Sequence, residues 1–120
     1  MLVGTLTTYA NPAATNLFEN KESSAMAYQA SPFCMAIVKG DFETVKKLIE
    51  LGEDINQRSL GLTPVMYAAK YNRCDILKLL IEKGANLKAK DSNNGFTALK
   101  FAELSNAKEA KAILEAALNA

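Results

Sequence analysis

"GLTPVMYAAKYNRCDILKLLIEKGANLKAKD" (residues 61–91) carries the start and stop signals of two short helices. Thr63 and Pro64 are typical of an N-cap and a first helical residue, because proline loses no hydrogen bond at that position. Asn72 tolerates the left-handed conformation and predicts the end of the first helix. Gly84 predicts the end of the second helix in the same way. The stretch therefore predicts a helix-turn-helix unit.

Both predicted helices have apolar faces suited to close packing. Val65, Ala68 and Ala69 lie on one face of the first helix, and the small alanines allow a neighbouring helix to approach. The apolar residues of 76–81 cover a face wider than a single stripe. A helix with neighbours on both sides needs such a wide face.

The same unit occurs three times. Three segments align without an internal gap: "SPFCMAIVKGDFETVKKLIELGEDIN" from Ser31, "TPVMYAAKYNRCDILKLLIEKGANLK" from Thr63 and "TALKFAELSNAKEAKAILEAALNA" from Thr97. One column holds Ala36, Ala68 and Ala102, another Gly40, Asn72 and Asn106, and a third Glu43, Asp75 and Glu109. Length varies only in the links, where repeat proteins tolerate insertions. We therefore expect an all-α solenoid of units 31–62, 63–96 and 97–120, with hairpin-like links rich in Asn and Gly.

Composition narrows the classes of function. The 120 residues suggest one domain, and 49% hydrophobic with 22% charged residues is typical of a globular protein. A net charge of +1 argues against a general nucleic-acid binder. The chain has no histidine, which removes Ser-His-Asp and Cys-His catalysis. Two cysteines, Cys34 and Cys74, are too few for a zinc site and are expected to be buried free thiols. We expect no cofactor and no metal.

Residues 1–30, the N-terminal quarter of the chain, do not follow the repeat pattern. Residues 1–10 are uncharged and look like the end of a signal peptide or like a frayed terminus. The first interpretation places the protein in the periplasm or outside the cell, and the second in the cytoplasm. Residues 11–30 are expected to form a helical cap on the first unit. No apolar run is long enough to predict a membrane span.

The three units resemble the ankyrin repeat family, whose repeat of about 33 residues carries T-P-L-H-x-A at its first helix. The signature reads "SPFCMA", "TPVMYA" and "TALKFA" here, and the resemblance covers about residues 31–120. The histidine column holds Cys34, Met66 and Lys100, so the hydrogen bond that the histidine makes to the hairpin is expected to be lost. The third unit lacks the Gly-Ala-Asp loop and is alanine-rich, as expected of a C-terminal cap.

The resemblance implies a non-catalytic scaffold that binds another protein through its first helices and hairpin tips. Three repeats with a cap are expected to form a monomer, or a dimer if the N-terminal segment leaves the first unit uncovered. An apolar and aromatic strip of Leu60, Leu62, Tyr71 and Phe96 is expected there. In the alternative, Leu62 and Phe96 pack beneath the hairpin as local core. The full set of candidates mapped to this side is Tyr28, Val38, Lys39, Leu60, Leu62, Met66, Lys70, Tyr71, Asn94, Phe96, Lys100 and Leu104.

Three functions remain open at this point. The first is a module that captures a partner protein, and the second is an exported envelope protein that inhibits or stabilises a partner enzyme. The third is an enzyme with paired carboxylates, such as Glu50 with Glu53 or Asp54, although these lie at a predicted helix end. Lysines 83, 88, 90 and 100 gather around the second link, where an acidic partner or a phosphate would fit. The few aromatic residues disfavour single-stranded nucleic acid.

Overall fold

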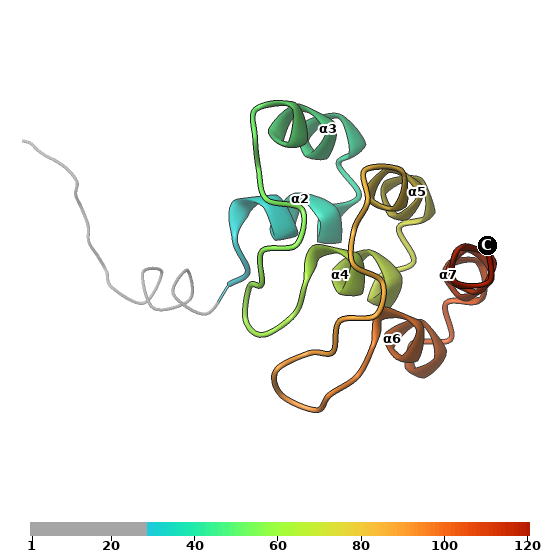
Figure 1. Ribbon diagram of the computed structural model, residues 1–120. Coiled ribbons are helices and arrows are strands. Elements are labelled where there is room, and N and C mark those ends of the chain that lie inside the picture. Colours follow the sequence, from blue (N-terminus) through green and yellow to red (C-terminus); the bar gives the residue numbers. More distant parts are fainter. Residues whose placement is uncertain (1–28) are drawn as a thin grey trace, which may run out of the picture.

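The computed structural model describes residues 29–120 and shows stacked pairs of helices. Figure 1 shows an inner row of α2, α4 and α6 and an outer row of α3, α5 and α7, with the links on one side. The helices are α2 (Pro32–Lys39), α3 (Phe42–Glu50), α4 (Pro64–Lys70), α5 (Cys74–Glu82), α6 (Ala98–Leu104) and α7 (Lys108–Leu118). Within the described residues the links contain a single isolated β-bridge, between Ser59 and Leu62. The predicted all-α solenoid is confirmed. Residues 1–10 and nearly all of the predicted cap at 11–30 lie outside the described residues.

The predicted helix ends are found in the structure. The Ser31 hydroxyl accepts a hydrogen bond from the backbone N–H of Cys34 at 3.2 Å, and the Thr97 hydroxyl accepts one from Lys100 at 3.2 Å. Asn72 has a φ of 55°, and the equivalent Asn106 has a φ of 57°. These asparagines let the chain turn sharply between the two helices of a unit.

Thr63 departs from the expected cap. It stands at the N-cap of α4, but its hydroxyl is buried and has no hydrogen-bond partner among the described residues. Its backbone N–H donates to Sδ of Met66 at 3.3 Å. The hydroxyl of Tyr67 donates to the carbonyl of Ser59 at 2.6 Å. In the middle unit, the residue at the histidine column, Met66, therefore contacts the backbone at the start of its own helix, and the neighbouring Tyr67 holds the first link.

The core lies between the two rows of helices. The shared alanine column is buried, with Ala68 and Ala102 both 0% exposed. The four apolar residues Ile76, Leu77, Leu79 and Leu80 of α5 are all buried, as their wide face predicts. Helix α4 packs against both α2 and α6, and α5 packs against both α3 and α7. The middle unit is thus the one that the structure surrounds on both sides.

Polar side chains fasten the turn of the middle unit to the units before and after it. Nε and Nη2 of Arg73 donate to the carbonyl of Val38 at 2.8 and 2.5 Å. The side-chain amide of Asn72 donates to Glu109 at 3.0 Å, and its oxygen accepts from the backbone N–H of Ala110 at 3.1 Å. The bond from Asn72 holds the pKa of Glu109 below its usual value. These contacts fix the register between successive units.

Asp91 organises the second link. It is 5% exposed, and its carboxylate accepts the backbone N–H groups of Asn93 and Asn94, both at 2.9 Å, and of Phe96 at 2.5 Å. Burial raises the pKa of Asp91, but the three N–H donors outweigh it, so the pKa lies below its ordinary value. The loop is therefore built around a charged carboxylate.

Replacing Arg73 tests the fastening between units. R73A removes two charge-assisted donors from a main-chain carbonyl, and we expect it to lower the free energy of unfolding by about 1.5–3 kcal/mol in urea titrations followed by circular dichroism. Lys78→Ala is the matched control, because Lys78 is an exposed cation on α5. Equal stability of the two variants would contradict the assignment.

Replacing Asp91 tests the charged loop. A depressed pKa in the folded state stabilises the fold above the unfolded-state pKa of about 3.9, and this stabilisation is lost as the pH falls through the folded-state value. We expect D91N to lower the melting temperature at pH 7 and to weaken the loss of stability on acidification. Thermal melts of both proteins from neutral pH to about pH 2 measure this. Parallel pH profiles would rule out the role of the Asp91 charge.

Candidate protein-binding surface

Exposed apolar side chains mark the inner side of the solenoid. Among the described residues, the large hydrophobic side chains that are exposed are Leu51 (75%), Leu60 (53%), Tyr71 (42%) and Leu104 (59%). Leu60 lies in the first link, and Tyr71 and Leu104 lie at the ends of the inner helices α4 and α6. Leu51 alone belongs to the outer row, as the C-cap of α3. Exposed apolar side chains that gather on one side are a common feature of binding surfaces.

The inner-helix ends form the first part of this surface. We use this name for Val38, Lys39, Lys70, Tyr71 and Leu104. Lys70 and Leu104 occupy equivalent positions on α4 and α6, which pack against each other. The ammonium group of Lys70 lies 5.7 Å from the centre of the Tyr71 ring, within the range of a cation–π interaction. Lys39 is exposed, whereas Val38 is half-buried.

The two links form the second part of the surface. Leu60 projects from the first link with a φ of 55°, and Asn94 is exposed in the second. The backbone N–H of Ser92 donates to the carbonyl of Gly61 at 2.9 Å, so the two links lie side by side. Phe96 is half-buried, with its ring edge-on to Phe101 at 5.8 Å between centroids.

Several of the predicted contact residues do not reach the surface. Leu62 is 8% exposed and Met66 is 0% exposed, because both point into the core beneath the link. The expectation that these two contact a partner was wrong, and for Leu62 the local-core alternative describes the structure. Helix α4 lies between Leu60 and Tyr71, and its seven residues span about 10 Å. The expected strip is therefore two patches at the two ends of α4. Tyr28 lies outside the described residues.

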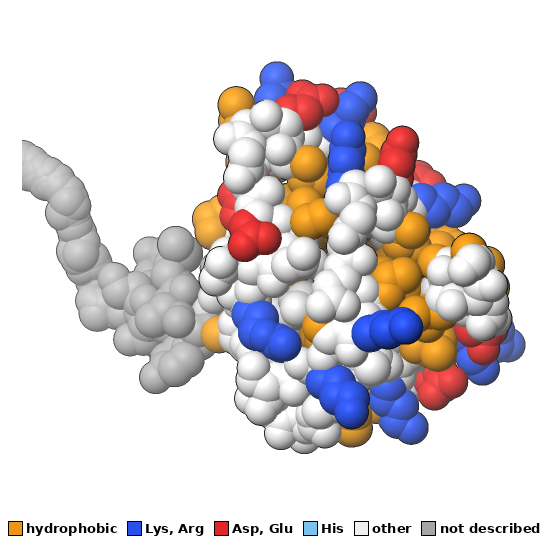
Figure 2. Space-filling view, in the orientation of Figure 1, with side chains coloured by type: hydrophobic (Ala, Val, Ile, Leu, Met, Phe, Trp, Pro, Cys, Tyr) orange, Lys and Arg blue, Asp and Glu red, His pale blue; other side chains and the backbone are white. Residues whose placement is uncertain are grey.

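A basic region adjoins the links. It consists of Arg58, Lys88, Lys90 and Lys100, all exposed, and we call it the link face. Figure 2 shows Lys and Arg side chains gathered over the lower part of the links and α6, while Asp and Glu side chains lie over the part of the first link next to α3 and at the top and right of the view. The sequence reading missed Arg58, which occupies the position in the first link that Lys90 occupies in the second. Aligning the links as well as the helices would have found it.

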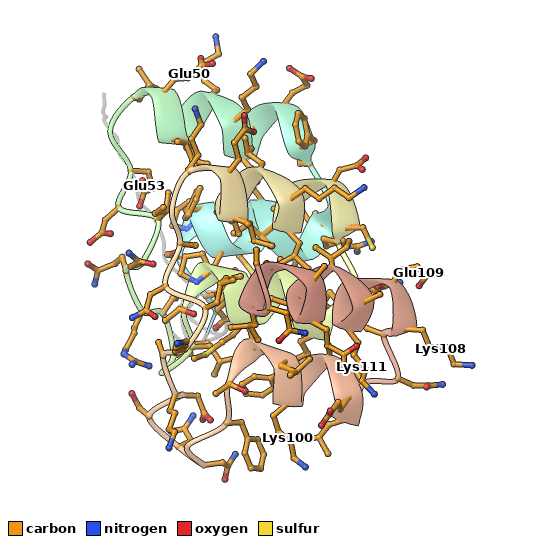
Figure 3. All side chains as sticks on the ribbon, turned by 45° about the vertical axis from the view of Figure 1, so that its right-hand side comes forward. Glu50, Glu53, Lys100, Lys108, Glu109 and Lys111 are labelled. Carbon is orange, nitrogen blue, oxygen red and sulfur yellow. The ribbon has the colours of Figure 1, made fainter. Side chains whose placement is uncertain are left out.

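The paired carboxylates considered for catalysis do not converge. Glu50 ends α3, whereas Glu53 and Asp54 are exposed in the loop that follows. Figure 3 shows the labelled Glu50 and Glu53 pointing away from one another into solvent. Asp54 is already engaged by the backbone N–H of Asn56 at 2.9 Å. The acidic side chains around this loop therefore do not face one another, as the two members of a catalytic pair would.

Shallow hollows on the outer side have mixed linings. One of about 310 Å³ lies between α6 and α7, where Lys111 and Glu103 form an ion pair at 3.9 Å. Two more, of about 300 and 280 Å³, lie between α3 and α5 and share the side chains of Phe42 and Leu79. Lysines and acidic residues alternate around both, which is typical of a solvated helix surface.

The described residues contain neither a reactive thiol nor a metal site. Cys34 is buried and Cys74 is half-buried, so the prediction of a buried thiol is confirmed for Cys34 only. Burial raises the pKa of both thiols, which keeps them protonated at neutral pH. Residues 29–120 contain no group of three or more Cys, Asp or Glu side chains placed to hold a metal ion. None of the helices described is long and apolar enough to cross a membrane.

Comparison with known proteins identifies the repeat. A family model for ankyrin repeats (three copies) matches residues 11–91 and 33–120. The chain is 43% identical over 56 residues to myotrophin of Xenopus tropicalis, covering 45% of this chain and 47% of that protein. It is 33% identical over 73 residues to a putative ankyrin repeat protein of Rickettsia felis, covering 61% of this chain and 27% of that protein.

A solved structure has the same architecture. It is a complex of a predatory endopeptidase from Bdellovibrio bacteriovorus with an immunity protein, and one of its chains matches with a TM-score of 0.68 and 36% identity. The match covers 74% of this chain and 47% of that chain, so this chain spans less than half of each of these three proteins. The family model accounts for all three stacked units, and the chain belongs to the ankyrin repeat family.

Proposed function

We propose that this protein binds a partner protein through the inner-helix ends and the links. Ankyrin repeats are protein–protein interaction modules. The observation that carries the proposal is that, within residues 29–120, three of the four exposed large hydrophobic side chains lie on this side. Tyr71 and Leu104 are exposed at the ends of neighbouring inner helices, and apolar side chains that gather on one side are a common feature of binding surfaces.

The residues of the inner-helix ends suit an interface core. Tyrosine is enriched among the residues that dominate binding energy, because it buries a large rigid area at little cost in entropy. The ammonium of Lys70 lies 5.7 Å from the centre of the Tyr71 ring, and Leu104 is exposed at the end of the neighbouring helix α6. The outer helices instead carry acidic and basic residues four positions apart, such as Lys78 and Glu82, which favour solvent.

A second, more specific proposal is that the partner is an enzyme that this protein inhibits or stabilises. The supporting observation is the similarity to a chain of the endopeptidase–immunity protein complex, at 36% identity. Identification of the captured partner tests it. An enzyme whose rate falls, or whose melting temperature rises, when the protein is added supports this proposal. A partner without catalytic activity contradicts it while leaving the binding function intact.

Substitution of the inner-helix ends tests the binding function. Y71S/L104S removes the exposed aromatic and apolar area, and we expect at least about a tenfold loss of partner recovered by affinity capture from the source organism. Helicity and melting temperature should stay close to those of the parent protein, because both side chains are exposed. L51S is the matched control, since Leu51 is the exposed leucine of the outer row. Undiminished capture by Y71S/L104S, or equal loss in L51S, would overturn the proposal.

A further inference from the structure

We propose that the link face binds an acidic segment of the partner protein, a carboxylate-rich stretch that also carries apolar side chains. This inference rests on the proposed function and specifies the chemistry of the partner. It follows from how charge is distributed between the two sides of the solenoid.

The outer helices are electrically balanced. Helices α3, α5 and α7, with their C-caps, hold six acidic residues, Glu43, Glu50, Asp75, Glu82, Glu109 and Glu115, and six basic ones, Lys46, Lys47, Lys78, Lys83, Lys108 and Lys111. Outside these helices, the described residues carry seven basic and five acidic side chains, so their excess of positive charge lies on the rest of the solenoid. A local field of this kind steers and selects a partner even when the total charge is small.

The link face carries that excess. Its four cations, Arg58, Lys88, Lys90 and Lys100, are exposed. The acidic residues nearest to them in the chain are Asp54 for Arg58, Asp91 for the two link lysines and Glu103 for Lys100. The Asp91 carboxylate is buried and already accepts three backbone N–H groups, although its charge still acts on Arg58. Asp54 accepts the backbone N–H of Asn56, and Glu103 pairs with Lys111 at 3.9 Å. None of the four cations forms an ion pair within the described residues, so all four are available to an external anion.

The cations are held in a defined arrangement. Arg58 and Lys90 stand at equivalent positions in two links that are joined by hydrogen bonds, from the backbone of Ser92 to Gly61 at 2.9 Å and from the side chain of Asn93 to Leu60 at 3.5 Å. Nη1 of Arg58 donates to the carbonyl of Gly61 at 3.2 Å, which positions the guanidinium and leaves its other donors available. Figure 3 shows the labelled Lys100 projecting from α6 into solvent.

The neighbouring side chains favour a peptide over a nucleic acid. Leu60 is exposed beside Arg58, and a leucine offers no flat face for a base to stack on. The Phe96 ring is occupied by its edge contact with Phe101. A peptide that alternates carboxylates with apolar side chains would contact both the cations and Leu60.

A binding assay on the described surface tests the inference. The probe is a fluorescein-labelled oligoglutamate peptide with a central pair of leucines, and fluorescence anisotropy measures its Kd for the full chain. We expect binding that weakens when salt is raised from about 50 to about 200 mM. K88E/K90E should weaken binding by at least about tenfold. K47E/K108E has the same net charge but alters the outer helices, and it should change the Kd by less than about twofold.

Three outcomes would overturn the inference: no binding of the peptide to the parent protein, equal weakening by both double variants, or tighter binding of a labelled single-stranded oligonucleotide than of the peptide. Partner capture distinguishes these failures from failure of the proposed function. If K88E/K90E retains the captured partner while Y71S/L104S loses it, the binding function stands and the acidic segment is excluded. If K88E/K90E also loses the partner, the link face is part of the interface.

Discussion

The fold depends on packing between neighbouring repeats, because none of these short helices buries its apolar face within its own pair. Helices α4 and α5 are covered by units before and after them, and the alanine column of Ala68 and Ala102 allows that close approach. Arg73 and Asn72 then join the turns of adjacent units through hydrogen bonds. Stability in such an array is a sum of contacts between nearest neighbours. The same contacts determine which side chains stay exposed and can bind a partner.

The two links join the packed helices to the proposed binding surface. Leu62 is buried beneath the first link and Tyr67 bonds to its backbone, and Asp91 organises the second link from within. A rigid loop loses little conformational entropy when it binds, so more of the contact energy appears as affinity. What the anchored links present outward is Leu60 together with a row of cations. An aromatic and apolar patch at the far ends of α4 and α6 completes the inner side.

The sequence predicted the elements well because their signals are local. Pro64, Asn72 and Gly84 act on their own backbone, and the alanine columns follow from comparing three copies of one unit. The placement of Leu62 and Met66 was not predictable from spacing, because a link residue faces the core or the solvent according to the path of the loop. The contact of Arg73 with the carbonyl of Val38 could not be predicted either. Every residue has a main-chain carbonyl, so the sequence does not show which one accepts the hydrogen bond.

Hydrogen–deuterium exchange of the full chain, with and without its captured partner, tests the central claim most directly: that the inner side and the links form the interface. The account predicts slower exchange on binding in residues 58–62 and 88–96 and at the C-terminal ends of α4 and α6. Exchange in α3, α5 and α7 should be unchanged. Protection confined to the outer helices, with the links exchanging as in the free protein, would contradict it.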